Sequence, residues 1–289
     1  MNPDRARKNV AGTAFFTAWA RALGRRIAGD AANGDDLAER VLLPWQRTLA
    51  SWPRLSVWLL ELGLPGAVGY FNARTQHFDA ALLQEAERGL QQVVILGAGF
   101  DSRSLRFARQ LASARVFEVD LPDVMALRAE QLFRGERTAA VAVPVDFEHD
   151  DLAASLDRHG YAEDARTFFL WEGVSYYLPS EAVSAILGMV AARSGPGSGI
   201  LFDYVTRAFV DGDYRAFGAR ELARGWRRLG DVNRFGVDDV AAFTEPLGLR
   251  IRSDVDADEL DRRYLQSPRG LRLRSWGCMR VAHAERGNG

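Results

Sequence analysis

Two glycines and an acidic residue follow neighbouring apolar segments in the middle of the chain, in an arrangement that could bind a nucleoside. The apolar run at residues 93–96 is followed by Gly97 and Gly99, which have no Cβ and let the backbone turn sharply against a ligand. The next apolar run, at residues 116–119, ends at Asp120. If both runs are parallel strands, the carboxylate of Asp120 lies where a ribose would bind above the glycine turn. The segment therefore predicts a site for a ligand that contains a nucleoside.

The residues after the second glycine favour a cationic ligand over a pyrophosphate. The dinucleotide pattern requires a third glycine, and Ser102 occupies that position. Asp101 stands beside the turn, where a carboxylate would repel a pyrophosphate but suit an ammonium group. S-adenosylmethionine carries an ammonium, a sulfonium and no phosphate, so it is the better candidate. Asp101 could equally cap a helix that begins at Ser102.

Two further strand ends carry candidate binding residues. Asp146 and Phe147 follow a third apolar segment, where a carboxylate and an adjacent ring could contact an adenine. Glu172 follows a fourth segment, at the position where ligands bind in open parallel sheets. Tyr176 and Tyr177 follow shortly after and could line a substrate pocket, although tyrosines at a strand end are also common in protein cores.

Strand and helix patterns alternate from residue 92 onward, which indicates an α/β fold with a parallel sheet and helices on both of its faces. The expected strands are 92–96, 115–119, 141–145, 167–171, 199–205, 249–254 and 276–282. The expected helices are 102–111, 122–133, 150–157, 180–192 and 238–246.

The first ninety residues show helical periodicity and no convincing strand. Helices are expected at 13–23 and 72–88, a cap at Asp35–Asp36, and breaks in the pattern at Pro44 and Pro53. We therefore predict an N-terminal helical cap or lid over residues 1–90, and a core over residues 91–289 with a helical insertion near 206–235.

Five motifs occur in an order that resembles a known family. They are Arg74-Thr75 before Asp79, GAGFDSR at 97–103, FEVDLP at 117–122, VDFEHDDL at 145–152 and WEGVSYYLP at 171–179. The segment at 36–39 adds a weaker match. Together they resemble the class I methyltransferases of the leucine carboxyl methyltransferase type, which include polyketide carboxyl O-methyltransferases of the tetracenomycin type. The family often has threonine at Ser102 and leucine at Phe147, so both positions depart conservatively from its pattern.

The resemblance implies a Rossmann-like fold with a seven-stranded, mostly parallel sheet, and a role for each matching residue. It implies that Arg74 pairs with the carboxylate of S-adenosylmethionine, that Asp120 binds the ribose and that Glu172 faces the ammonium. The glycines would pass beneath the methionine part, and Asp146 and Phe147 would contact the adenine. The implied cofactor residues are Arg74, Gly97, Gly99, Asp101, Asp120, Leu121, Asp146, Phe147 and Glu172.

The expected reaction is transfer of a methyl group to an oxygen atom of a small molecule. A carboxylate acceptor is already ionised at neutral pH and needs no general base, which fits a chain without an obvious catalytic pair. A phenolic acceptor, the main alternative, would need a base, and His149 and Tyr176 are its weak candidates. A nicotinamide-dependent reductase is less favoured, because Lys8 is the sole lysine and no Tyr-x-x-x-Lys pair exists. A non-catalytic nucleoside-binding protein stays open.

The acceptor is expected to be bulky and apolar or aromatic, because aromatic residues gather in the N-terminal region and the insertion. They are Phe15, Phe16, Trp19, Trp58, Phe209, Phe217 and Trp226. Candidates for positioning it are Tyr176, Tyr177 and Tyr204. A protein C-terminus is the competing acceptor, as in the eukaryotic branch of the family. The sequence does not determine the oligomeric state.

Composition argues against several other functions and partners. The net charge of −1 gives no basic field for nucleic acid or an anionic membrane. Cys278 is the only cysteine, so neither an internal disulfide nor a zinc cluster is expected. The chain begins with a polar, charged segment, and no apolar run approaches membrane-spanning length, so we expect a cytoplasmic protein.

Overall fold

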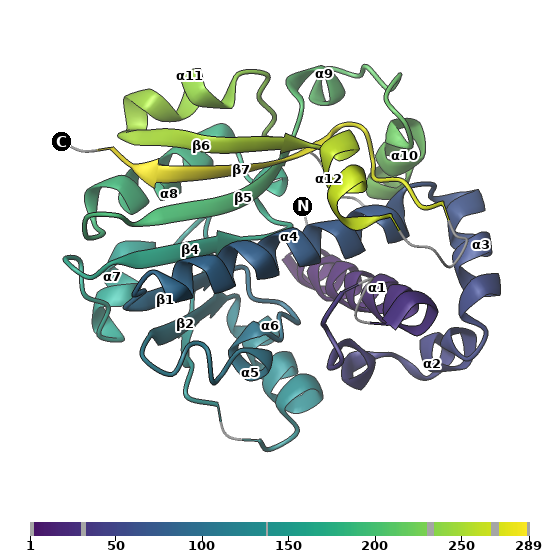
Figure 1. Cartoon of the computed structure of the whole chain (residues 1–289), viewed down its shortest axis with the longest axis horizontal. Coiled ribbons are helices and arrows are strands. Elements are labelled where there is room, and N and C mark those ends of the chain that lie inside the picture. Colours follow the sequence, from purple (N-terminus) through teal and green to yellow (C-terminus); the bar gives the residue numbers. More distant parts are fainter. Residues whose placement is uncertain (1–2, 30–32, 137, 230–233, 267–271, 288–289) are drawn as a thin grey trace.

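A seven-stranded sheet forms the centre of the molecule (Figure 1). The computed structural model describes residues 3–29, 33–136, 138–229, 234–266 and 272–287, and for 3–11 and 229 it describes only the backbone. The strands lie in the order β3-β2-β1-β4-β5-β7-β6, and only β7 runs antiparallel to its two neighbours. Their bounds are β1 Gln92–Leu96, β2 Arg115–Asp120, β3 Val141–Pro144, β4 Thr167–Trp171, β5 Gly199–Val205, β6 Leu249–Asp256 and β7 Met279–Arg286.

The pairing of the central strands brings the predicted binding residues to one edge of the sheet. β1 and β4 are buried along their whole length, as their continuous apolar runs predict for inner parallel strands. Leu96 pairs in register with Trp171 on one side and with Val119 on the other. The residues that follow these strands therefore meet at the carboxyl edge. The strand order reverses between β1 and β4, which is where open parallel sheets bind ligands.

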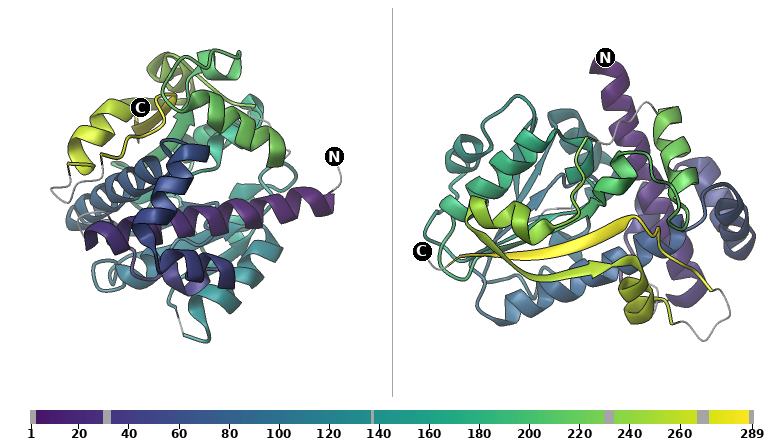
Figure 2. Two further views of the ribbon diagram at one scale, coloured as in Figure 1. Left: turned by 90° about the vertical axis from the view of Figure 1, so that its right-hand side faces the viewer. Right: turned by 90° about the horizontal axis from the view of Figure 1, so that it is seen from above.

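Helices cover both faces of the sheet, as predicted. On one face α4 (Ala67–Glu87) and α12 (Ala257–Tyr264) bury Phe78, Leu82 and Leu260 against β1 and β4. On the other face α7 (Leu152–Arg158), α8 (Ser180–Ala192) and α11 (Val240–Thr244) bury Leu156 and Leu187 with the opposite side chains of the same strands. Figure 2 shows these layers from two further directions.

The remaining N-terminal helices lie beyond the carboxyl ends of the parallel strands (Figure 1). They are α1 (Pro3–Ala28), η2 (Ala38–Val41), α2 (Pro44–Ala50) and α3 (Pro53–Gly63). Pro44 and Pro53, which were predicted to break the helical pattern, each begin a new helix at its first position, where a missing N–H costs nothing. The division into residues 1–90 and 91–289 stays a prediction.

Two further short helices follow β5 in the predicted insertion. They are α9 (Arg207–Val210) and α10 (Ala219–Leu229), and residues 230–233 of the insertion lie outside the described part of the chain. Trp226 of α10 is buried, so α10 packs one of its faces inward while its arginines Arg224, Arg227 and Arg228 are exposed.

Several predicted elements differ from the structure in their ends, and α1 extends ten residues before and five residues after the helix expected at 13–23. The helix expected at 102–111 is only α5 (Arg103–Arg106), followed by turns to residue 113. The strand expected at 276–282 begins at Met279, because the N–H of Met279 bonds to the carbonyl of Trp276 in a turn. The helix expected at 122–133 continues from α6 (Pro122–Arg128) as a π-helical segment, η3 (Ala129–Phe133). No helix among the described residues is long and apolar enough to span a membrane.

Candidate functional site

The glycine turn after β1 adopts a conformation that requires glycine. Gly97 and Gly99 have φ values of +69° and +44°. A Cβ on Gly97 would lie 2.3 Å from Cγ2 of Val174, so the loop after β4 packs directly on the turn. The N–H groups of Gly97 and Ala98 donate to the carbonyl of Val119 at 2.8 and 2.9 Å. The turn is thus fixed against both neighbouring strands.

Asp120 binds the glycine turn with its carboxylate. Gly99 donates its N–H to Oδ2 at 2.6 Å, and Leu121 donates its N–H to Oδ1 at 2.7 Å. Burial raises the pKa of Asp120 to about 6, and these two hydrogen bonds together with the charge of Arg128 only partly oppose it. A carboxylate offers about four acceptor positions, so each oxygen can still accept a bond from a ligand hydroxyl.

A buried ion pair lies behind the turn. The guanidinium of Arg128 binds Glu118 at Oε2 (3.1 Å) and also at Oε1, and neither side chain is more than 2% exposed. Its Nη1 also donates to the carbonyl of Gly99 at 2.9 Å. Arg128 therefore connects the turn to β2.

Nine charged side chains form one continuous network along the carboxyl edge, which we call the strand-end charge network. They are Arg21, Asp35, Arg74, Asp79, Asp101, Arg103, Arg106, Glu172 and Asp203. Five carboxylates face four guanidinium groups, so its formal charge is −1. Buried charges need such pairing, because an unpaired charge in the interior is strongly destabilising.

Glu172 lies at the centre of this network, between two arginines. Its Oε1 accepts from Nε of Arg74 at 3.0 Å, and its Oε2 lies 2.7 Å from Nη1 of Arg103. Burial pushes the pKa of Glu172 upward, but Arg103, Arg74 and Arg21 outweigh it and hold the pKa at about 2. Glu172 is therefore a fixed negative charge at the end of β4, as a contact to an ammonium group requires.

Asp203 of β5 holds the other side of Arg74. Its Oδ2 accepts from Nη1 of Arg74 at 2.6 Å and from the hydroxyl of Tyr70 at 2.7 Å, while its Oδ1 accepts the N–H of Gly173 at 2.7 Å. Asp203 is fully buried. The site predicted from the sequence does not include Asp203, since nothing local reveals a partner 129 residues away.

Arg103 is a further site residue that the sequence analysis missed. It pairs with Asp101, with Asp79 (Nε to Oδ1, 2.7 Å) and with Glu172. Asp101 also accepts the N–H of Arg103 at 2.7 Å, so its carboxylate is engaged at the start of α5. Arg103 is the last residue of the motif at 97–103, and this position could have identified it as a site residue.

The N-terminal helices are bound to the glycine turn through Arg21 and Asp35. Arg21 donates to the carbonyl of Phe100 at 3.1 Å and to Asp35 at 2.8 Å, and Asp35 accepts from the hydroxyl of Ser102 at 2.7 Å. Of the two acidic residues predicted to cap a helix, it is Asp35 that accepts the N–H of Ala38, whereas Asp36 is exposed. The N-terminal segment is thus part of the site's framework.

Asp146 and Phe147 lie at the rim of the strand ends. The carboxylate of Asp146 is 41% exposed, lies 3.1 Å from Nδ1 of His149 and accepts the N–H of Glu148. Phe147 is half-buried against the core. Both residues follow β3 as predicted, and in the described part of the chain no ion pair connects Asp146 to the strand-end charge network.

The three candidate substrate-positioning tyrosines do not lie together. Tyr176 stacks on Trp226 with ring centroids 5.2 Å apart, and Tyr177 contacts both rings. Tyr204 belongs to the core on the opposite face of the sheet, where its hydroxyl donates to Asp254 at 2.9 Å. The structure therefore groups Tyr176 and Tyr177 with α10 and separates Tyr204 from them.

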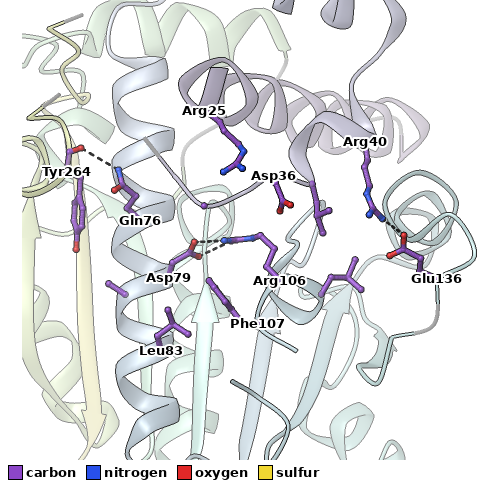
Figure 3. A pocket seen from close by; sticks show the side chains of 14 residues that line it. Arg25, Asp36, Arg40, Gln76, Asp79, Leu83, Arg106, Phe107, Glu136 and Tyr264 are labelled. Carbon is purple, nitrogen blue, oxygen red and sulfur yellow. Dashed lines mark hydrogen bonds and ion pairs between the residues drawn. The ribbon is translucent and has the colours of Figure 1, made fainter. Parts of the chain in front are cut away.

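A cavity of about 790 Å³ opens beside the strand-end charge network (Figure 3). Its lining includes the paired side chains of Asp79 and Arg106 and those of Arg40 and Glu136. This lining includes none of the nine residues, all within the described part of the chain, that the sequence assigned to a cofactor. We locate the functional site by the glycine turn and the strand ends, because the groups suited to a nucleoside and an ammonium meet there.

Comparison with known proteins gives a family match over most of the N-terminal two thirds of the chain. The model of the leucine carboxyl methyltransferase family matches residues 14–191. Proteins of Parafrankia sp. (strain EAN1pec) and Mycobacterium avium (strain 104) are each 35% identical over 206 residues, which cover 68% of this chain and 63% of theirs. A protein of Mycolicibacterium smegmatis is 31% identical over 264 residues, 86% of this chain and 80% of its own. All three carry the provisional name S-adenosyl-L-methionine-dependent methyltransferase. The matched region is thus less than two thirds of the length of the first two.

Two solved structures share the fold over nearly the whole chain. One is a protein from Thermobifida fusca with the provisional name methyltransferase, with a TM-score of 0.57, 16% identity and coverage of 93% of this chain and 94% of that one. The other is a DUF574 family protein from Streptomyces avermitilis, with a TM-score of 0.58, 18% identity and coverage of 93% and 97%. At these identities the likeness extends to the fold alone.

Proposed function

Because the chain belongs to the leucine carboxyl methyltransferase family, we propose that it is an S-adenosylmethionine-dependent methyltransferase acting on an oxygen atom of a small molecule. Bound S-adenosylmethionine would supply a methyl group already activated on a sulfonium. The task of the protein is then to hold the cofactor, to align the acceptor and to exclude competing nucleophiles. Good alignment alone is worth about 7–11 kcal/mol of a barrier.

The charges at the strand ends fit this cofactor. The strand-end charge network has one carboxylate more than it has guanidinium groups, and Asp120 adds another acidic group beside it. S-adenosylmethionine has two cationic groups and one carboxylate, so its charge complements the site. A pyrophosphate would meet the same carboxylates with repulsion. This match favours the methyl donor over a nicotinamide dinucleotide.

Individual residues would hold the cofactor as follows. Asp120 would accept the ribose hydroxyls with the acceptor positions that the backbone N–H groups leave open. Glu172, fixed as a carboxylate, would face the ammonium. Arg74 would bind the carboxylate of the cofactor while keeping Asp203 as its buried partner, so its contact with Glu172 is the one that would rearrange. Asp146 and Phe147 would contact the adenine at the rim.

We propose a carboxylate as the acceptor, and the observation that carries this choice is the environment of Tyr176 and His149, the two residues that the sequence offered as a general base for a phenol. Burial and Asp203 raise the pKa of Tyr176, so its hydroxyl stays protonated and cannot take a proton from a phenol. His149, the other candidate, has a side chain that is 77% exposed, so water surrounds most of its ring and the protein does not hold it against an acceptor. A carboxylate needs no proton removed before it attacks a methyl group.

The acceptor would bind against the aromatic side chains at the end of β4 and on α10. Tyr176, Tyr177 and Trp226 contact one another, and Phe209 packs on Trp226 at 5.6 Å. These flat rings suit a bulky aromatic or apolar acid, such as a polyketide. A protein C-terminus remains the alternative acceptor for a family named after a leucine carboxyl group.

The proposal is tested with labelled S-adenosylmethionine and a matched pair of acceptors, an aromatic carboxylic acid and the phenol with the same rings. We expect label in the product of the acid, released as methanol by mild alkali because a methyl ester hydrolyses there. A base-stable product formed only from the phenol would contradict the carboxylate assignment. A thermal shift produced by NAD and not by S-adenosylhomocysteine would contradict the methyltransferase assignment as a whole.

Cofactor binding is expected to weaken as the pH falls through about 6, the pKa of Asp120. The ionised carboxylate accepts both ribose hydroxyls, whereas the protonated form must donate at one oxygen. Binding of S-adenosylhomocysteine therefore competes with protonation, and its Kd should rise towards tenfold per pH unit below that pKa. Calorimetric titration between pH 5 and 8 measures this effect. Asp120→Asn is the control, in which the slope should disappear, and an equal slope in both proteins would exclude Asp120 as its source.

A further inference from the structure

Seven large apolar side chains are exposed on α2, on α3 and at Trp52 between these two helices, and together we call them the α2–α3 face. Their exposed fractions are Trp45 54%, Leu49 38%, Trp52 69%, Leu55 51%, Trp58 57%, Leu59 49% and Leu62 65%. These are the large hydrophobic side chains that stand exposed in the part of the chain that the structure describes. Scattered exposed leucines are normal, but a set of this size on two adjacent helices is not.

The α3 part of this face is a continuous stripe suited to packing against another helix. Leu55 and Leu62 each lie three and four residues from the adjacent pair Trp58 and Leu59, so the four share one side of α3, whereas Ser56 and Val57 on the other side are buried. This spacing gives a narrow apolar seam of the kind that pairs helices. We therefore expect a second helix to pack against this stripe.

The size of the α2–α3 face matches one side of a stable protein interface. If a whole tryptophan exposes about 250 Å² and a whole leucine about 150 Å², the exposed parts amount to about 750 Å². The largest apolar patch on a typical monomer is about 300–600 Å². A standard interface buries about 800 Å² on each partner. The face is large enough to be half of a dimer.

Charges beside the stripe are complementary in an antiparallel arrangement. Arg54 and Glu61 stand seven residues apart on the same flank of α3, about 10 Å along its axis. Arg54 is exposed, and Glu61 is half-buried and accepts the N–H of Gly66 at 2.8 Å. If a second α3 lies antiparallel, each Arg54 approaches the flank that carries the other Glu61. Burial raises the pKa of Glu61, so a neighbouring guanidinium would stabilise its charged form.

We propose that the chain forms a symmetric dimer in which the α2–α3 face packs on the same face of a second copy, with the two α3 helices antiparallel. Closed two-fold symmetry is the commonest arrangement of homo-oligomers and uses one self-complementary surface twice. The interface lies on helices of the N-terminal region, and none of its side chains belongs to the strand-end charge network. The test of the dimer therefore does not depend on whether the proposed reaction is correct.

Sedimentation equilibrium of the whole chain measures the assembly. Wild type is expected to have twice the mass of the 32.0 kDa chain. Leu59→Arg places a charge in the centre of the stripe and should give the single-chain mass at the same concentration. Arg54→Glu should raise the Kd of the dimer at least about tenfold, because the new glutamate would lie near Glu61 of the other copy at two symmetric places. Arg109→Glu, the same reversal at an exposed arginine after α5, is the control and should leave the mass unchanged.

Circular dichroism and the unfolding midpoint establish that each variant is folded. A wild-type chain that sediments as a monomer would overturn the proposal. So would a monomer that floats with phosphatidylserine vesicles, which would instead assign the tryptophans and arginines to a lipid surface. A dimer that Leu59→Arg leaves intact would place the interface elsewhere, and a dimer indifferent to Arg54→Glu would refute the antiparallel arrangement.

Discussion

Arg128→Met should lower the free energy of unfolding by about 3–5 kcal/mol, the cost of leaving one member of a buried ion pair without its partner. Glu118 is 2% exposed at its side chain, so water cannot replace the guanidinium. The substitution also removes the donor to the carbonyl of Gly99. Methionine fills a similar space, which keeps the effect of a cavity small. Denaturant unfolding followed by tryptophan fluorescence measures the change.

The double variant Glu118→Leu with Arg128→Met separates the cost of an unpaired Glu118 carboxylate from the cost of changed packing around residue 128. If the loss comes from the uncompensated carboxylate, the double variant should recover a large part of it, since apolar replacements of buried pairs are often neutral. Arg109→Met, at an exposed arginine, controls for the removal of a positive charge. A loss below about 1 kcal/mol for Arg128→Met, in the range of exposed ion pairs, would contradict this account.

Asp120→Ala should weaken the binding of S-adenosylhomocysteine by about 100- to 10,000-fold. Two ribose hydroxyls lose a charged acceptor, and each such bond is typically worth about 1.5–3 kcal/mol. The folded state should persist, because burial already disfavours the charged carboxylate, as its pKa of about 6 indicates. Isothermal titration calorimetry measures the affinity, and the unfolding midpoint confirms that the variant is folded.

Asp123→Ala provides the matched control, because Asp123 is an exposed carboxylate three residues further along the chain. It should bind S-adenosylhomocysteine as wild type does. An Asp120→Ala protein that binds within about threefold of wild type would remove Asp120 from the cofactor site. Loss of affinity in both variants would point to a general change of charge at the strand ends rather than to contacts with the ribose.

The sheet could be predicted closely from the sequence because its inner strands are short, continuous apolar runs between turn residues. β1, β4 and β5 and helix α8 have the bounds that the patterns predict. The errors arose where tertiary contacts decide an element's end. No glycine or proline occurs between Arg106 and Pro122, yet α5 ends at Arg106. Helix α12 was missed, although Asp256 and Glu259 form the acidic start that its cap uses, with the N–H of Glu259 donating to Asp256 at 2.8 Å.

The positions of the site residues could be predicted, but their partners could not. Each strand-end residue follows its own strand, so the pattern around Gly97, Asp120 and Glu172 was sufficient to bring them to one edge. The pairing of Arg74 with Asp203 depends on how α4 lies across the sheet and on β5, which no local pattern encodes. Tyr204 was predicted to position the substrate, but its side chain lies on the opposite face of the sheet. Side chains alternate along a strand, so when Asp203 faces the site its neighbour Tyr204 must face away from it.

The order of strands at one edge of the sheet has a consequence for how the chain acquires its structure during synthesis. β7, which follows β5 and β6 along the chain, lies between them in the sheet and pairs with both. Until it emerges from the ribosome, β5 presents an open edge and β6 has no described strand to pair with. Such unpaired edges attract other chains. Folding of this half of the sheet must therefore wait for the synthesis of β7, while the glycine turn and its neighbours can assemble earlier.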